Sequence, residues 1–198
     1  MHRASYRLIG LFSTLLALSL LSACTTLMPS IPTNWPQHSA QLKNFNTWTA
    51  SGTMSITTSK QHLQSHFNWQ QNRGNYNINW WGPLGCYHYQ LQGAPAHVKL
   101  TTVEGKTYTA HSPEQLLVNT LNMHLPVSNL QSWIKGLPDP ISAWHGQWDN
   151  QGNLIYLSQQ GWTLIFSNYT YYGTNLPTQI IAKNPEIRLK LVIKEWAR

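Results

Sequence analysis

Cys24 is the residue best placed for covalent chemistry, because it follows an apolar run near the start of the chain. The run extends from Leu8 to Leu21 and follows a basic start that contains Arg3 and Arg7. It is too short to cross a bilayer comfortably as a mature helix, so it predicts a cleavable export signal. A thiol at the end of such a signal is a candidate for lipid attachment.

The residues from Leu21 to Cys24 resemble the lipobox of bacterial lipoproteins. This resemblance implies that the Cys24 thiol is diacylglycerylated, that the chain is cut before Cys24, and that the new amino terminus is acylated. We therefore expect residues 1–23 to be a cleaved signal peptide, and no cofactor besides the covalent lipid on Cys24. The alternative is an ordinary signal peptide with a chance cysteine.

The other polar side chains do not suggest catalysis or metal binding. The six carboxylates form no close pair, and the sequence has neither a Gly-x-Ser-x-Gly nucleophile motif nor a phosphate-binding loop. His62 and His66 share one face of an expected strand, with His88 as a potential neighbour, but no acid or thiol has matching spacing. Cys86 is expected to be a small packed side chain, with a reactive thiol as the alternative. We therefore expect no enzyme activity, no catalytic residues and no metal site.

The charge balance points to an anionic partner. Thirteen Lys and Arg against six acids give a net charge of +7, and losing Arg3 and Arg7 with the signal leaves +5. Lipid headgroups, an acidic protein or nucleic acid would suit such a surface. No basic cluster is longer than Arg188-x-Lys190, which argues against nucleic acid. Ten Trp and nine Tyr are typical of membrane interfaces and ligand pockets.

The elements that position these residues begin after a linker. Residues 24–44 contain Pro29, Pro32 and Pro36 among small and polar residues, and we interpret them as an extended lipidated tether. About twenty residues at ~3.1 Å each give a reach of roughly 60 Å. Residues 45–198 then have the size of one domain.

Within that domain, apolar and polar residues alternate with period two, which predicts half-buried antiparallel strands. The expected strands are 48–57, 62–69, 76–80, 87–91, 98–100, 108–110, 154–159, 162–167, 179–183 and 187–194.

The middle of the chain changes to a helical period. Ser112 and Pro113 predict a helix start, and this helix should run to about Leu121. A second helix is expected from Ser128, with its apolar stripe at Leu130, Trp133, Ile134 and Leu137.

Many strands with a helical insert predict an α+β fold. We expect a strongly curved antiparallel sheet that forms an open, incomplete β-barrel, with helices covering the open side. Such a body can enclose an apolar cavity. The alternative is that the aromatic side chains simply pack together.

Four motifs are similar to those of the LolB family of outer-membrane lipoprotein receptors. They are Trp48-x-Ala50-x-Gly52, Phe67-Asn68-Trp69-Gln70-Gln71, Pro83-Leu84-Gly85 and the run from Leu125 to Pro138. The resemblance covers essentially the whole mature chain. It implies one open-barrel domain over 45–198, with a helical lid and an apolar interior. Thr25, after the lipidated cysteine, fits sorting to the outer membrane in this family.

The resemblance also implies a function and partners. The protein would take acylated lipoproteins from a soluble periplasmic carrier, LolA, and place them in the outer membrane, anchored as a monomer at its periplasmic face by Cys24. A family leucine that projects from a loop and helps deliver lipid to the membrane corresponds to Leu84, between Pro83 and Gly85. The partners would be the carrier, the lipoprotein cargo and outer-membrane phospholipid.

The apolar strand faces and the helix stripe form our hypothesis for the acyl-binding cavity. Its predicted lining is Trp48, Met54, Ile56, Phe67, Trp69, Ile78, Trp80, Tyr89, Leu91, Leu130, Trp133 and Ile134. The competing interpretation is a surface carbohydrate-binding lipoprotein, which would use exposed Trp and Tyr as sugar platforms.

Overall fold

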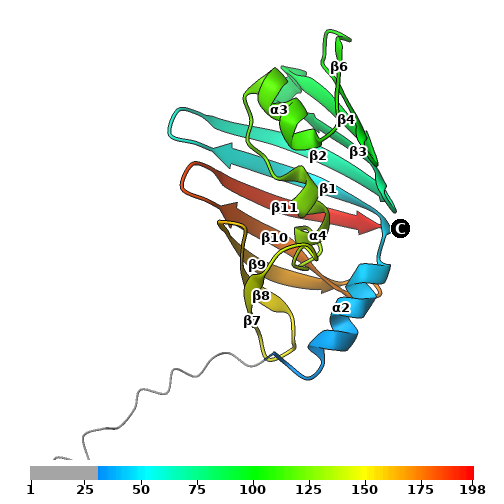
Figure 1. The fold of residues 1–198 in the computed structure, drawn as a ribbon, viewed down its shortest axis with the longest axis vertical. Helices are drawn as coiled ribbons and strands as arrows, with labels where there is room; N and C mark the ends of the chain where they lie inside the picture. Colours follow the sequence, from blue (N-terminus) through cyan, green and yellow to red (C-terminus); the bar gives the residue numbers. More distant parts are fainter. Residues whose placement is uncertain (1–30) are drawn as a thin grey trace, which may run out of the picture. The chain divides into compact units, whose positions relative to one another are not determined.

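The computed structural model of the chain describes residues 31–198, so the expected signal peptide and Cys24 lie outside the described residues. All described strands belong to one antiparallel sheet, with the order β6-β5-β4-β3-β2-β1-β11-β10-β9-β8-β7 (Figure 1). The strands are β1 (Thr47–Thr57), β2 (His62–Asn72), β3 (Asn75–Trp81), β4 (His88–Ala94), β5 (His97–Thr101), β6 (Thr107–Ala110), β7 (Trp144–Trp148), β8 (Leu154–Gln159), β9 (Trp162–Tyr171), β10 (Asn175–Lys183) and β11 (Arg188–Ala197). The last strand pairs with the first, which joins two meanders into one sheet.

Two helices cover one face of this sheet, α3 (Pro113–Leu121) and α4 (Val127–Trp133) (Figure 1). The Ser112 side chain caps α3 by accepting a hydrogen bond of 3.2 Å from the Gln115 amide. The sheet is open because its end strands, β6 and β7, do not pair with each other. The predicted α+β fold, an open antiparallel sheet with helices over its open side, is confirmed.

The strand alternation places the apolar side chains under the helices. In β1, Trp48, Ala50, Gly52 and Ile56 are buried, while Thr49, Ser51, Thr53 and Ser55 between them are partly exposed. The pairing of β1 with β11 shifts register at Gly52, where an added Cβ would clash with the Val192 carbonyl oxygen. Glycine at this position therefore lets the two central strands approach each other closely.

The predicted end of the extended tether was wrong. The extended tether does not continue to Asn44, because residues 35–44 form the helix α2 (Trp35–Asn44). Trp35 and Leu42 lie seven residues apart, on one helix face, and both are buried. Pro36 sits in the first turn, where a missing amide hydrogen costs nothing. The prolines therefore mark a helix start here.

A short edge strand was also not predicted. β7 has five residues and contains Gly146, so its periodic signal is weak. Among residues 31–198, no helix combines the length and apolar character needed to cross a bilayer.

Candidate functional site

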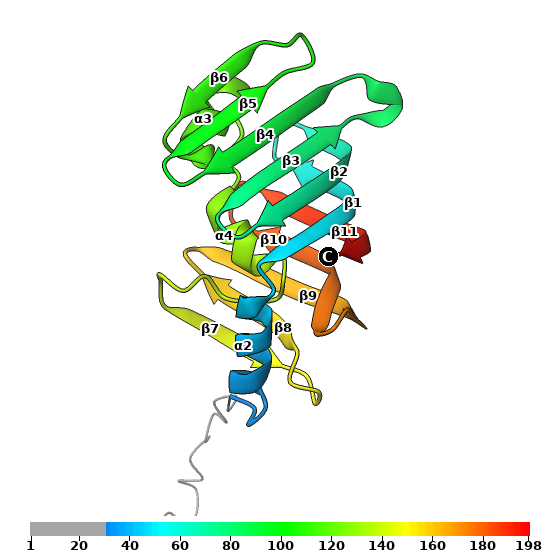
Figure 2. The same cartoon turned by 90° about the vertical axis from the view of Figure 1, so that its right-hand side faces the viewer.

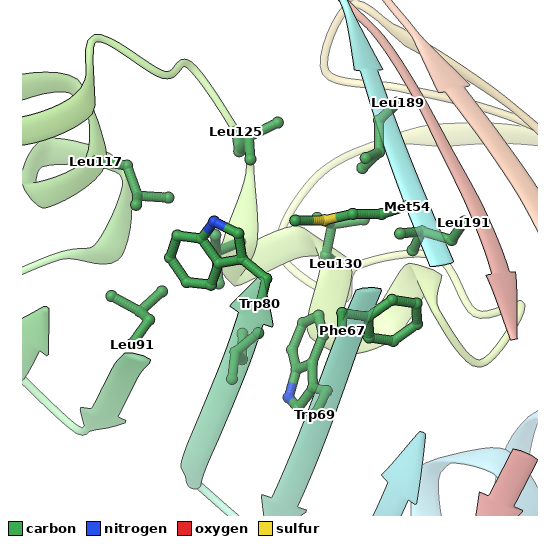
Figure 3. A pocket seen from close by; sticks show the side chains of 12 residues that line it. Met54, Phe67, Trp69, Trp80, Leu91, Leu117, Leu125, Leu130, Leu189 and Leu191 are labelled. Atoms are coloured by element: carbon green, nitrogen blue, oxygen red, sulfur yellow. The ribbon is translucent and has the colours of Figure 1, made fainter. Parts of the chain in front are cut away.

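An apolar cavity of about 50 Å³ lies between the sheet and the two covering helices (Figure 3). Its walls are Met54, Phe67, Trp69, Ile78, Trp80, Leu91, Leu117, Leu125, Val127, Leu130, Leu189 and Leu191. Figure 3 shows side chains from α3 and α4, such as Leu117 and Leu130, facing Trp80 and Met54 of the sheet. No charged side chain is part of this lining.

Two further hollows share wall residues with this cavity. A second hollow of about 150 Å³ shares Met54 and Trp80 with the first and also has a polar wall that includes Ser65. A third, open hollow of about 520 Å³ shares Ile56 with the second and Leu125 with the first. The third hollow lies at the end of the sheet where β1 turns into β2, since Thr58 and Gln61 also line it.

Most of the predicted lining residues come together at the two inner hollows. Met54, Phe67, Trp69, Ile78, Trp80, Leu91 and Leu130 line the first cavity. Ile56 and Tyr89 line the second.

Three predicted residues line neither of these hollows. Trp48 packs beside Trp69 and Trp196, with ring centroids 5.6 and 5.3 Å away. Trp133 donates a hydrogen bond of 2.8 Å from its indole nitrogen to Gln159 Oε1. Ile134 is fully buried in the same core. These side chains stabilise the fold without contributing to the cavity walls.

Several wall residues of the first cavity were not among the lining residues predicted from the sequence. Leu189 and Leu191 belong to a strand whose alternation already indicated a buried face. Leu117 lies on the predicted first helix. Leu125 and Val127 lie at the junction of α3 and α4, and no periodic signal marks them.

One carboxylate ties the two covering helices together. Glu114, in the first turn of α3, accepts hydrogen bonds from the Ser128 amide (2.7 Å) and from its hydroxyl (3.1 Å), at the start of α4. A carboxylate at a helix amino terminus also interacts favourably with the helix dipole. In this state α3 and α4 therefore form one connected cover over the cavity.

Figure 2 shows the connection between β3 and β4 at one end of these strands. Leu84 lies on this connection and is exposed to solvent. Leu84 is 107% exposed and has left-handed backbone angles, φ 55° and ψ 17°. The loop is closed by hydrogen bonds from the Gly82 amide to the Tyr87 carbonyl (3.0 Å) and from the Gly85 amide to the Gly82 carbonyl (3.1 Å). This arrangement holds an apolar side chain away from the protein.

Tyr87 anchors that loop to β2. Its hydroxyl donates to the Gln64 carbonyl at 2.8 Å and lies 2.7 Å from Ser65 Oγ. A Cβ on Gly82 would lie 2.5 Å from both the Tyr87 ring and the Cys86 sulfur, so the loop packs tightly around this glycine. The expectation that Cys86 is a packed side chain is wrong, because Cys86 is exposed.

The three histidines lie on the outer face, away from the cavity. His66 stacks on Trp81 with ring centroids 5.8 Å apart, and His88 meets the edge of the same indole at 6.5 Å. His62 Nδ1 lies 2.8 Å from the Thr57 hydroxyl. In residues 31–198, no group of three or more His, Cys, Asp or Glu side chains could hold a metal ion.

Comparisons with known proteins identify the family. The family model described as outer membrane lipoprotein LolB matches residues 46–196. The chain is 35% identical over 185 residues to the outer-membrane lipoprotein LolB of Coxiella burnetii, covering 89% of this chain and 88% of that protein. It is 34% identical over 197 residues to the protein of the same name from Cellvibrio japonicus, covering 96% and 97%.

A solved structure supports the fold alone. A DUF1329 family protein from Desulfovibrio piger superimposes with a TM-score of 0.55 at 10% identity, over 82% of this chain and 90% of that one. The family match spans nearly all of the sheet and both covering helices, including the cavity and the Leu84 loop. The chain belongs to the LolB family of outer membrane lipoproteins.

Proposed function

We propose that this protein is an outer-membrane receptor that accepts acylated lipoproteins from a LolA-type periplasmic carrier and inserts them into the outer membrane. The observation that carries the proposal is the pairing of an apolar cavity under two helices with a fully exposed leucine on a closed loop. The cavity suits hydrocarbon chains, and the loop suits contact with a bilayer.

Lipid transfer needs shelter from water. Each buried CH₂ group gains ~0.8 kcal/mol, so exposing three chains of about fifteen carbons would cost on the order of 30 kcal/mol. Free diffusion of the cargo is excluded by that magnitude. Transfer must therefore run directly from the carrier cavity to the receptor cavity, and then downhill into the bilayer. This process needs no catalytic residue and no cofactor.

The covering helices must move for an acyl chain to enter. An apolar cavity of about 150 Å³ holds one benzene ring. The first cavity here has a volume of about 50 Å³, which is too small for an acyl chain. We interpret the described state as the closed, unloaded receptor. Displacing α3 and α4 would join this cavity to the two hollows that share its walls.

The amino-terminal anchor completes the proposal. Cleavage after residue 23 and acylation of Cys24 would hold the receptor at the periplasmic face of the outer membrane. Residues 24–34 would then form the tether that leads into α2.

Leu84→Glu tests the delivery loop. We expect cargo to move from the carrier to the variant at the wild-type rate, because Leu84 is not part of the cavity walls. Insertion into vesicles should fall by about tenfold or more, since a charge in the membrane core costs about 2.5 kcal/mol. The measurement is a transfer assay that separates carrier-bound, receptor-bound and vesicle-bound cargo.

Leu84→Met is the matched control, because it keeps an apolar tip of similar size. It should insert cargo at nearly the wild-type rate. Normal uptake and normal insertion by Leu84→Glu together would contradict the role of the loop.

A further inference from the structure

Three neighbouring cations lie on the outer face of the sheet, at the hairpin between β10 and β11. Lys183 pairs directly with Arg188, and Lys190 lies two residues further along β11. Residues at i and i+2 of a strand share a face, so the three side chains form one cluster, here named the basic strip. Lys183 and Arg188 are exposed and Lys190 is half-buried. The alternating residues Leu189 and Leu191 are buried on the cavity side.

The basic strip has no carboxylate partner in the described part of the chain. Among residues 31–198 the single ion pair joins Lys106 to Glu104. Glu186 is near in sequence, but it lines the hollows on the other side of the sheet. The positive charge of the strip is therefore available to an external anion.

The strip lies at the same end of the sheet as the Leu84 loop. Arg188 lies beside Thr57, the last residue of β1, where the chain turns into β2. Trp81, the last residue of β3, pairs with His66 near the start of β2. In the order β3-β2-β1-β11 three strand steps separate β3 from β11, about 15 Å across the sheet at the usual spacing of about 4.8 Å.

The side chains next to the loop on this outer face suit the boundary of a bilayer. Trp81 is half-buried and lies between His66 and His88, both exposed. Tryptophan is enriched where membrane and water meet. An apolar tip, an interfacial indole and a strip of cations thus follow one another along one end of the sheet.

We infer that the basic strip binds the phosphate headgroups of anionic phospholipids, and so orients the receptor with its Leu84 loop against the bilayer. This inference rests on the proposed function, because it assumes that the loop contacts a membrane. The strip adds a second point of contact, three strands away from β3, and two separated contacts fix an orientation that one leucine cannot. Lys and Arg near an anionic surface each contribute about a fivefold preference for the bound state.

A lipid surface fits the strip better than the carrier does. A carrier that passes acyl chains from cavity to cavity must dock over the hollows beside Met123 and Leu125. The strip points away from those hollows, on the opposite face of the sheet. It lies at the same end of the sheet as Leu84, the most exposed large apolar side chain among residues 31–198, as a membrane contact requires.

The test uses the full lipid-anchored chain in vesicles. An environment-sensitive fluorophore on Cys86, an exposed thiol two residues after Leu84, reports whether the loop enters the bilayer. Emission is compared between vesicles of phosphatidylcholine alone and vesicles that also contain phosphatidylglycerol. The variant is Lys183→Gln/Arg188→Gln/Lys190→Gln. The matched control is Lys43→Gln/Arg73→Gln/Lys99→Gln, which loses the same three charges elsewhere.

The wild-type chain should show a stronger blue shift when phosphatidylglycerol is present. In the strip variant this dependence should disappear, with the docked fraction relative to the undocked one falling on the order of 100-fold. The control variant should keep it. High salt should weaken docking of the wild type, because salt screens exposed charges. Thermal unfolding of both variants checks that the fold is unchanged.

Other results would overturn the inference. Equal losses in both variants would show that only total charge matters. A strip variant that docks normally but receives cargo slowly from the carrier would assign the strip to carrier binding. A wild-type blue shift that is the same on both vesicles would refute the headgroup contact and leave the delivery loop intact. No blue shift on any vesicle would refute the loop contact, and the proposed function with it.

Discussion

At the scale of single residues, Leu84 is unfavourable in two ways: its backbone angles are left-handed and its apolar side chain is fully exposed to water. An L-residue with left-handed backbone angles is about 1–2 kcal/mol less stable than in the right-handed region. The side chain gains nothing in return, because it is fully exposed and packs against no neighbour. A residue that is present despite both unfavourable features indicates a functional role. The position thus exchanges stability for contact with another surface.

Leu84→Asn should separate these two properties. Asparagine tolerates left-handed angles best among residues with a side chain, so the free energy of unfolding should rise by about 0.5–1 kcal/mol. Cargo insertion should be lost, because the apolar tip is gone. Urea denaturation and the transfer assay measure the two effects.

Leu84→Ala serves as the control for the stability effect, since it removes the side chain and keeps the unfavourable angles. Its unfolding free energy should match that of the wild type. A lower stability for Leu84→Asn than for Leu84→Ala would contradict the backbone explanation.

At the scale of elements, the pair α3–α4 is the part of the cavity wall most able to move. Its principal polar link is Glu114, whose carboxylate accepts both hydrogen bonds from Ser128. Three further side-chain bonds connect α4 to the rest of the domain, from Gln71 to Gln131 (3.4 Å), from Asn129 to Gln160 (3.1 Å) and from Trp133 to Gln159 (2.8 Å). The sheet strands, by contrast, are held by continuous ladders of backbone hydrogen bonds. Opening is therefore expected at the helices.

Glu114→Gln should loosen this cover. The neutral amide keeps the shape of the side chain but weakens the charge-assisted bonds, at a cost of about 1 kcal/mol. That change should raise the open fraction, and the rate of uptake of a fluorescent fatty acid, about fivefold. Quenching of Trp emission in a stopped-flow instrument measures the rate.

Glu104→Gln is the comparison, because Glu104 makes an exposed ion pair with Lys106 far from the cavity walls. It should leave uptake unchanged. If Glu114→Gln also leaves uptake unchanged, the two helices do not open at this link.

Sequence periodicity predicted most elements and part of the site. Alternation gave the strands, and the capping residue Ser112 gave α3. The helix α2 was not predicted, because Pro36 is equally compatible with an extended linker. The stripe of Leu130, Trp133 and Ile134 showed which helix face is buried. The sequence does not show whether this buried face packs tightly or borders a cavity. That depends on side chains from distant parts of the chain that lie opposite it.

At the scale of the whole molecule, one buried cation joins distant segments. Lys135, just after α4, donates hydrogen bonds to the carbonyls of Leu42 (3.1 Å) and Phe45 (3.2 Å) at the end of α2. Burial lowers the pKa of Lys135 from its ordinary value of 10.5 to about 8. The charged form is favoured in the unfolded chain, so its burial costs stability at neutral pH.

Lys135→Met should reveal this cost through its pH dependence. Between pH 8 and 10.5 the unfolded chain binds more protons at this site than the folded one, so the wild-type unfolding free energy should rise with pH. The rise is on the order of 3 kcal/mol and should be absent from the variant. Urea titrations across this pH range, with the difference between the two proteins as the readout, measure it.

Lys43→Met, at an exposed position, controls for the loss of a lysine and should follow the wild-type pH profile. A constant stability difference between wild type and Lys135→Met across the range would refute the assigned pKa change.

Because the two edges of the sheet are not joined, the volume between sheet and helices can change. A closed β-barrel has a fixed diameter, because widening it would break the backbone hydrogen bonds between two neighbouring strands. Here β6 and β7 never meet, so the sheet can flatten or tighten while every strand keeps its neighbours. Its volume can therefore adjust to cargo with two acyl chains or three, limited only by how far the side chains between sheet and helices can be parted.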